Sequence, residues 1–196
     1  MDAAKLKGMA IVALGEGTKL GRVGDVLFDT QPLRATALRA TGEGQTFVIP
    51  YAQIASIGAD AVTVASGQVT QTASKEGAFG GLPGLGALTR LKVVDEAGTL
   101  VGVVGGIALD PPTGLVTGLA VHKGGLLGLG GTTTTLDPAT IRGVGDDLLT
   151  VAMGCAASAG AERLPATLPD QHEARWHDDG GAPAADADRD AGEPGR

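Results

Sequence analysis

Aromatic side chains, cysteine and asparagine are scarce or absent in this chain of 196 residues. Aromatic residues make up 3% of the chain and hydrophobic residues 43%, so a core has to be built from Val, Leu, Ile and Ala. The lone cysteine, Cys155, excludes a disulfide framework and a thiolate metal cluster. Asparagine is missing altogether, which we interpret as a bias of genome composition.

The sequence also shows no targeting or membrane-spanning pattern. Residues 1–7 lack the apolar stretch of a signal peptide. The longest uncharged apolar run, Leu100 to Leu109, is about half of the ~20 residues that a membrane helix needs. We therefore expect a cytoplasmic protein without a transmembrane segment.

The charge is unevenly distributed. Of the 22 acidic and 15 basic residues, nine and four lie in residues 155–196, which leaves residues 1–154 with a net charge of −2. Proteins that bind nucleic acid by neutralising phosphates normally present a basic face. The near-neutral main part of the chain therefore argues against a nucleic-acid partner.

Glycine, in contrast, is abundant. The chain has 33 glycines, and each glycine inside a helix costs roughly 1 kcal/mol relative to alanine. Long helices are thus disfavoured, and the composition fits short strands joined by tight turns.

An internal repeat organises the chain, and its two copies align without difficulty. At an offset of 81 the matching pairs are Gly21/Gly102, Val23/Val104, Gly24/Gly105, Asp29/Asp110, Thr36/Thr117 and Leu38/Leu119. At an offset of 87 they are Ile54/Ile141, Gly58/Gly145, Asp60/Asp147, Thr63/Thr150 and Val64/Val151. One domain is therefore written twice, and the second copy carries a six-residue insertion.

Each copy is predicted to consist of short strands. In the first copy we expect strands at 9–14, 20–29, 34–40, 46–50 and 61–65, with a turn or a single helical turn at 51–57. The second copy repeats this plan from 91 to 151, with its fourth strand at 132–136 after the loop 123–131 that holds the insertion. Strands at this spacing, with no long helix, predict an all-β fold of two small barrels or sandwiches.

Four segments follow from this pattern. They are a first β-domain at 1–67, a Gly-rich apolar linker at 68–88, a second β-domain at 89–154 and an acidic tail at 155–196. We expect the linker to be too rich in glycine for a stable helix. The tail is too polar to bury enough surface to offset its ordering entropy, so we expect it to be disordered.

Five stretches of the two copies carry a recognisable pattern: 19–29, 49–54 and 57–64 in the first copy, and 114–119 and 143–151 in the second. Together with Gly8 and Met9 before the first strand, they resemble the PRC-barrel family. The resemblance covers about residues 6–153 and implies two tandem barrels of about six short strands. Family members include the cytoplasmic domain of the photosynthetic reaction-centre H subunit and the C-terminal domain of a ribosome-maturation factor. The understood members act by binding proteins. We expect neither the membrane helix of the former nor the N-terminal partner domain of the latter, so neither role is carried over.

Candidate catalytic groups are few. His122 is the single histidine outside the tail, where His172 and His177 lie beside Asp178 and Asp179. A nucleophile needs a base fixed beside it, and we interpret His122 as a surface residue at the end of a strand.

Asp29 and Asp110 occupy equivalent positions and are predicted to serve turns. Residues 15–21 look superficially like a phosphate-binding loop but lie between two strands, so we expect a hairpin turn. We expect no catalytic residue, no cofactor and no metal site.

Apolar side chains in Gly-rich segments are the remaining candidates for function. They are Phe79, Leu82 and Leu85 in the linker and Leu126, Leu127 and Leu129 in the insertion. One interpretation is that they fold back and cap the barrels. The other is that they form an interaction patch for a partner or for self-association. We expect a non-catalytic adaptor or assembly protein with an unidentified protein partner. The alternatives are a ribosome- or RNA-associated factor and a peripheral membrane protein that uses these loops.

Overall fold

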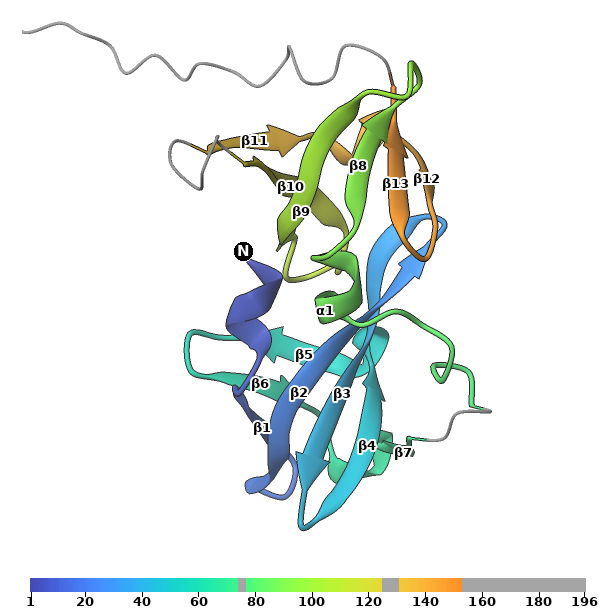
Figure 1. The fold of residues 1–196 in the computed structure, drawn as a ribbon. Coiled ribbons are helices and arrows are strands. Elements are labelled where there is room, and N and C mark those ends of the chain that lie inside the picture. Colours follow the sequence, from blue (N-terminus) through green and yellow to red (C-terminus); the bar gives the residue numbers. More distant parts are fainter. Residues whose placement is uncertain (74–76, 125–130, 153–196) are drawn as a thin grey trace, which may run out of the picture. The chain divides into compact units, whose positions relative to one another are not determined.

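The computed structural model describes residues 1–73, 77–124 and 131–152, and each copy of the repeat forms its own sheet (Figure 1). The first sheet has seven strands in the order β5-β6-β1-β2-β3-β4-β7. The strands are β1 (Ala10–Ala13), β2 (Thr18–Thr30), β3 (Leu33–Gly42), β4 (Gln45–Pro50), β5 (Ile54–Ile57), β6 (Ala61–Val64) and β7 (Gln71–Thr72). The short 3-10 helices are η1 (Ala3–Leu6), η2 (Tyr51–Gln53) and η3 (Gly67–Val69).

The second sheet has six strands in the order β11-β10-β9-β8-β13-β12. Its elements are β8 (Lys92–Asp95), β9 (Leu100–Leu109), β10 (Val116–Lys123), β11 (Thr132–Leu136), η5 (Pro138–Thr140), β12 (Ile141–Val144) and β13 (Leu148–Val151). A single-turn helix, α1 (Leu85–Leu88), precedes it.

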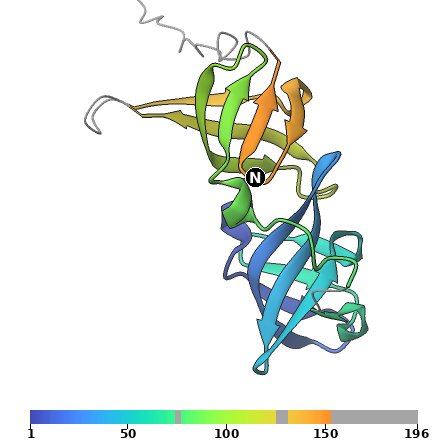
Figure 2. The same ribbon diagram turned by 45° about the vertical axis from the view of Figure 1, so that its right-hand side comes forward.

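The two sheets share one topology. In each copy the first and last strands pair in parallel, β1 with β6 and β8 with β13, and the other neighbouring strands of the repeat pair antiparallel. Both sheets curl around the residues that they enclose (Figure 2). The prediction of two tandem barrels of about six short strands is therefore confirmed. The strand bounds on either side of the insertion, Gly42/Gln45 and Lys123/Thr132, differ by the predicted six residues.

Two local predictions were wrong. The turn expected at 51–57 ends with η2, and residues 54–57 form β5, which pairs with β6. The two inner residues of β5 are both exposed, so the alternation that marks a strand is missing from its sequence. The linker, expected to be helix-free, contains α1. Leu85 and Leu88 are both buried, and this tertiary packing stabilises the turn despite the surrounding glycines.

The core is aliphatic, as the composition predicts. Strand alternation is clearest in β6, where Val62 and Val64 are fully buried and the residues between and before them are only partly buried. Phe28 and Tyr51 are the aromatic members of the buried set, and no polar or charged residue within the described ranges belongs to it. Burial of these side chains from water is the main source of stability.

Two equivalent glycines permit a close approach between strands. A Cβ atom on Gly21 would lie 2.4 Å from the carbonyl oxygen of Thr41, and one on Gly102 would lie 2.6 Å from that of His122. Neither distance is possible for a real side chain. The repeat therefore keeps glycine here because the neighbouring strand occupies the space of a Cβ atom.

The two copies contact each other through backbone and side chains. Arg34 and Leu115 form an isolated antiparallel bridge, and the amide of Ala35 donates to the carbonyl of Gly114 at 2.8 Å. Linker residues add a second contact with β2, where the amide of Phe28 donates to the carbonyl of Pro83 at 3.0 Å. One cluster of buried side chains includes residues from both copies. The hydrophobic cores of the two copies are therefore continuous.

Candidate interaction site

A hollow of about 620 Å³ lies beside the contact between the copies. The β2–β3 turn, the start of β10, η5 and the start of β12 surround it. Its apolar lining residues are Pro32, Leu33, Leu115, Val116, Pro138 and Ile141. Residues far apart in the sequence are therefore brought together into one concave surface by the repeat.

Leu115 is the exposed apolar residue of this hollow. Its side chain is 49% exposed, whereas the next residue, Val116, is 8% exposed. The alternation of β10 turns Val116 inward, and the left-handed glycine before Leu115, Gly114 at φ 72°, sets where the strand begins. The turn thus leaves one large apolar side chain in contact with water.

The opposite wall is fixed by a helix cap and an ion pair. The side chain of Asp137 accepts a hydrogen bond from the amide of Ala139 at 2.8 Å and so caps η5, which begins at Pro138. Arg142 Nε donates to Glu96 Oε1 at 3.0 Å. Both side chains of this pair are about half exposed, so the pair orients the guanidinium more than it stabilises the fold.

Tyr51 forms the other half of the contact between the copies. Its hydroxyl donates to the carbonyl of Pro111 at 2.9 Å, and the residue is 6% exposed. A Cβ atom on Gly114 would lie 2.9 Å from the ring, so the ring packs directly on that glycine. Burial, followed by the nearby Asp110 carboxylate, raises the pKa of Tyr51 from 10.0 to about 12.

The family assignment rests on both copies. The sequence model of the PRC-barrel domain family matches this chain at residues 1–71 and again at residues 86–152. The chain belongs to the PRC-barrel family. Both copies are PRC-barrel domains, and the resemblance seen in the sequence is confirmed. A comparison with curated proteins gave no match.

The apolar linker residues predicted as a patch pack on the first PRC-barrel domain. Phe79 and Leu82 are partly buried against a small cluster made of Leu27, Ala37 and Val48. Leu85 is 4% exposed and belongs to the main core. All three side chains therefore contribute to packing in the described part of the chain, with Leu85 the most buried of them. Whether the exposed parts of Phe79 and Leu82 also bind a partner stays a prediction.

The other half of the predicted patch cannot be placed. Leu126, Leu127 and Leu129 lie outside the described residues, as does the acidic tail, 155–196. The expectations for these two segments stay predictions.

The polar residues that the sequence singled out serve local structure. Asp29 Oδ1 accepts from the amide of Gln31 at 2.9 Å, as predicted for a turn. Its counterpart Asp110 differs in detail, because its carboxylate accepts from the hydroxyl of Thr113. His122 is exposed in β10, with Nδ1 at 2.7 Å from Thr133 Oγ1. Residues 14–17 join the antiparallel strands β1 and β2, so the predicted hairpin turn is confirmed, although residues 18–21 already belong to β2.

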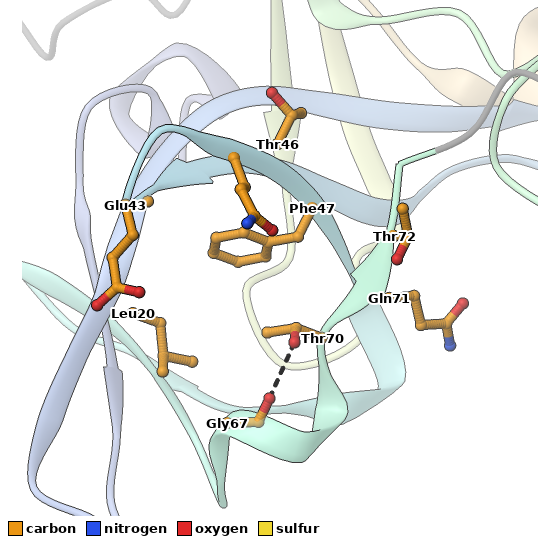
Figure 3. A pocket seen from close by; sticks show the side chains of 10 residues that line it. Leu20, Glu43, Thr46, Phe47, Gly67, Thr70, Gln71 and Thr72 are labelled. Atoms are coloured by element: carbon orange, nitrogen blue, oxygen red, sulfur yellow. Dashed lines mark hydrogen bonds between the residues drawn. The ribbon is translucent and has the colours of Figure 1, made fainter.

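A second hollow, of about 260 Å³, lies in the first PRC-barrel domain between β2, the β3–β4 hairpin and the η3–β7 segment (Figure 3). Its walls are mostly polar, and Glu43 carries the one charge among the lining residues. The Thr70 hydroxyl donates to the carbonyl of Gly67 at 3.0 Å, so this hydroxyl is used within the wall. The hollow offers hydrogen-bonding groups but little apolar surface for a protein partner.

Two further findings concern the described ranges. They contain no group of three or more His, Cys, Asp or Glu residues that could hold a metal ion. None of their helices is long and apolar enough to cross a bilayer.

Sequence reasoning missed the residues that matter at the larger hollow. Leu115 stands where the first copy has Arg34, and Pro138 stands where it has Tyr51. The alignment of the copies contained both differences. That these two differences concern one surface is visible only in the structure, where the turns before Arg34 and Leu115 lie against each other.

Proposed function

We propose that the protein is a non-catalytic adaptor or assembly factor that binds a partner protein at the larger hollow. The observation that carries this proposal is the exposure of Leu115 at the rim of a concave, largely apolar surface. A single exposed leucine is ordinary, but this one adjoins a hollow whose walls are mostly apolar, and together they form a continuous apolar surface that supports a protein contact.

The neighbouring contact between the copies supports this proposal. The bridge between Arg34 and Leu115 and the bond from Tyr51 to Pro111 show that the same turns already hold one barrel against another. A surface built to pack on a protein needs little change to bind a second one. The near-neutral charge of residues 1–154 predicts that binding depends on apolar contact more than on salt.

Site-specific photo-crosslinking in cells tests the proposal. Ala139, exposed at the hollow, is replaced by a photo-reactive amino acid, and the repeat-equivalent Ala52, also exposed, provides the matched control. We expect a discrete protein adduct from position 139 that is absent from position 52. The adduct should disappear when Leu115→Asp is added, because a charge at the rim must be desolvated on binding.

Two results would contradict the proposal. One is the same set of adducts from positions 139 and 52, which would mean nonspecific collision. The other is an adduct from position 139 that Leu115→Asp leaves unchanged. Circular dichroism of each variant shows that the fold is intact.

A further inference from the structure

The contact between the two copies is approximately two-fold symmetric. Arg34 and Leu115, which pair with each other, are themselves equivalent residues at the repeat offset of 81. An isolated pairing of equivalent residues is the mark of an isologous contact, in which each copy offers the same patch. Every residue of one half of the contact therefore has a counterpart in the other half.

The larger hollow is the counterpart of the place that Tyr51 occupies. At the offset of 87, η2 corresponds to η5, and Tyr51 corresponds to Pro138, the first residue of η5. At the offset of 81, the acceptor carbonyl of Pro111 corresponds to that of Thr30. Pro138 and Thr30 both line the hollow. The second copy thus lacks the aromatic side chain that closes this place in the first.

The space that remains in the two halves differs accordingly. Beside Tyr51, the hollow between β5 and Pro111–Pro112 measures about 210 Å³. The equivalent hollow beside Pro138 measures about 620 Å³. The larger volume remains although Leu33, which replaces Gly114 in this half, adds a side chain to its wall. The open hollow beside Pro138 exceeds its counterpart by about 410 Å³, more than the roughly 150 Å³ of a cavity that holds benzene, so the difference between the halves leaves room for an aromatic ring.

Arg142 adds an electrostatic reason for an aromatic occupant. Its counterpart in the first copy is Ala55, which has no charge. Arg142 lines the hollow and is held by Glu96 at 3.0 Å. A guanidinium attracts the face of an aromatic ring. In the half that lacks its own ring, a cation therefore stands at the position that Ala55 occupies in the other half.

We propose that the larger hollow receives an aromatic side chain of a partner protein, in the way that Tyr51 occupies the equivalent place in the first copy. The ring packs between Leu33, Leu115 and Ile141, with the guanidinium of Arg142 over its face. A tyrosine hydroxyl reaches the carbonyl of Thr30, as that of Tyr51 reaches Pro111. This inference rests on the proposed function and adds the chemistry of the partner.

Titration of the full chain with N-acetyl-L-tyrosinamide, followed by NMR of backbone amides and methyl groups, tests this inference. The largest shifts are expected at Leu33, Leu115 and Ile141. In Pro138→Tyr, which supplies the ring from within, the dissociation constant should rise by about tenfold or more. Gln53→Tyr adds the same ring at an exposed position of η2 in the first copy and should leave binding unchanged. N-acetyl-L-leucinamide should bind less tightly than the tyrosine compound.

Three results would overturn the inference. They are the absence of shifts at the hollow, undiminished binding by a folded Pro138→Tyr, and equal affinity for the leucine compound. If Pro138→Tyr does not fold, Ala139→Trp covers the rim without touching Pro138 and gives the same readout. The crosslinking experiment separates the two proposals, because an adduct from position 139 without tyrosinamide binding rejects the aromatic partner alone. Tyrosinamide binding without an adduct rejects the protein partner.

Discussion

The two PRC-barrel domains differ where they meet, although their strands follow the same order. Both keep the glycine that lets β2 approach β3 and β9 approach β10. They differ at η2 and η5, where the first has Tyr51 and the second Pro138. This pair of glycines is therefore retained in both copies, whereas the surface of contact differs between them.

The outer edge of each sheet shows a second difference. In the first domain, β7 pairs with β4 through Phe47–Thr72 and Val48–Gln71. The equivalent strand β11 pairs only with β10 in the part of the chain that the structure describes. The first domain is thus the more enclosed of the two, at its edge as well as at Tyr51. We therefore expect a partner to bind at the second domain, on the side where the hollow lies.

The largest expected loss of stability tests the close strand approach that both copies share at Gly21 and Gly102. Gly21→Val and Gly102→Val each place a Cβ atom within 2.6 Å of a carbonyl oxygen of the neighbouring strand. Each should reduce the free energy of unfolding by about 3 kcal/mol, because the strands must separate. Urea denaturation followed by circular dichroism measures this loss.

The control for these variants is Gly86→Ala in α1. A Cβ atom there meets nothing within 4 Å, so the variant should be slightly more stable than the parent, by up to about 1 kcal/mol. If only one of Gly21→Val and Gly102→Val is destabilising, the two strand approaches are not equivalent and the shared role of glycine is wrong.

The next effect tests the main difference between the copies. Tyr51→Ala removes a buried ring and its bond to Pro111, and should cost about 3 kcal/mol. Pro138→Ala, at the equivalent position beside an open hollow, should cost less than about 1 kcal/mol. Thermal unfolding of both variants compares them. Equal losses would mean that Pro138 supports the fold as Tyr51 does, and the asymmetry between the two halves would be lost.

The fold was predictable from the sequence because the repeat and the glycine and strand patterns are local. The alternation in β6 and the Asp29 turn can each be identified within ten residues. β5 was missed because its inner residues, Ala55 and Ser56, do not alternate in polarity, so only its pairing with β6 reveals it. α1 was missed because packing of Leu85 and Leu88 outweighs the low helix propensity of the linker.

The candidate site was not predictable for a different reason. It is formed by two turns about 81 residues apart that meet only after both barrels have folded. Nothing in the sequence near Leu115 or Pro138 indicates that these residues share a surface. The sequence instead drew attention to Phe79, Leu82 and Leu85, whose apolar character is largely used in packing on the first domain.

A smaller effect concerns the pH dependence of the first half of the contact. The pKa of Tyr51 is raised from 10.0 to about 12 by burial and by Asp110, so the folded state keeps its proton where the unfolded state has lost it. Burying the neutral phenol of Tyr51 contributes its full share of the unfolding free energy below pH 10. This contribution is lost as the pH rises from about 10 to about 12. The loss should be on the order of 2 kcal/mol.

Tyr51→Phe isolates this contribution, because every other titrating group is unchanged. The difference in unfolding free energy between the parent and the variant should shrink between pH 10 and pH 12. A difference that stays constant across this interval would show that Tyr51 is solvated, and the closed half of the contact would then resemble the open one.

The smallest effect distinguishes two glycines that the alignment treats as equal. Both Gly24 and Gly105 lie at irregularities in strand register. A Cβ atom on Gly24 would lie 3.5 Å from the Arg39 carbonyl oxygen, an ordinary contact, whereas one on Gly105 would lie 1.8 Å from the ring of His122. Gly24→Ala should therefore be nearly neutral. Gly105→Ala should cost about 1 kcal/mol, because the exposed ring can turn away but loses its bond to Thr133.

A double-mutant cycle decides whether this cost belongs to the ring. In a His122→Ala background the Cβ atom added at position 105 would have free space, so Gly105→Ala should become nearly neutral there. A cost that persists without the imidazole would come from the backbone at the bulge. Gly24→Ala would then be expected to show the same cost, because it occupies the same irregularity. In that case both glycines would be needed only for the backbone of the bulge. The contacts of His122 indicate instead that Gly105 is also needed to leave space for the imidazole ring.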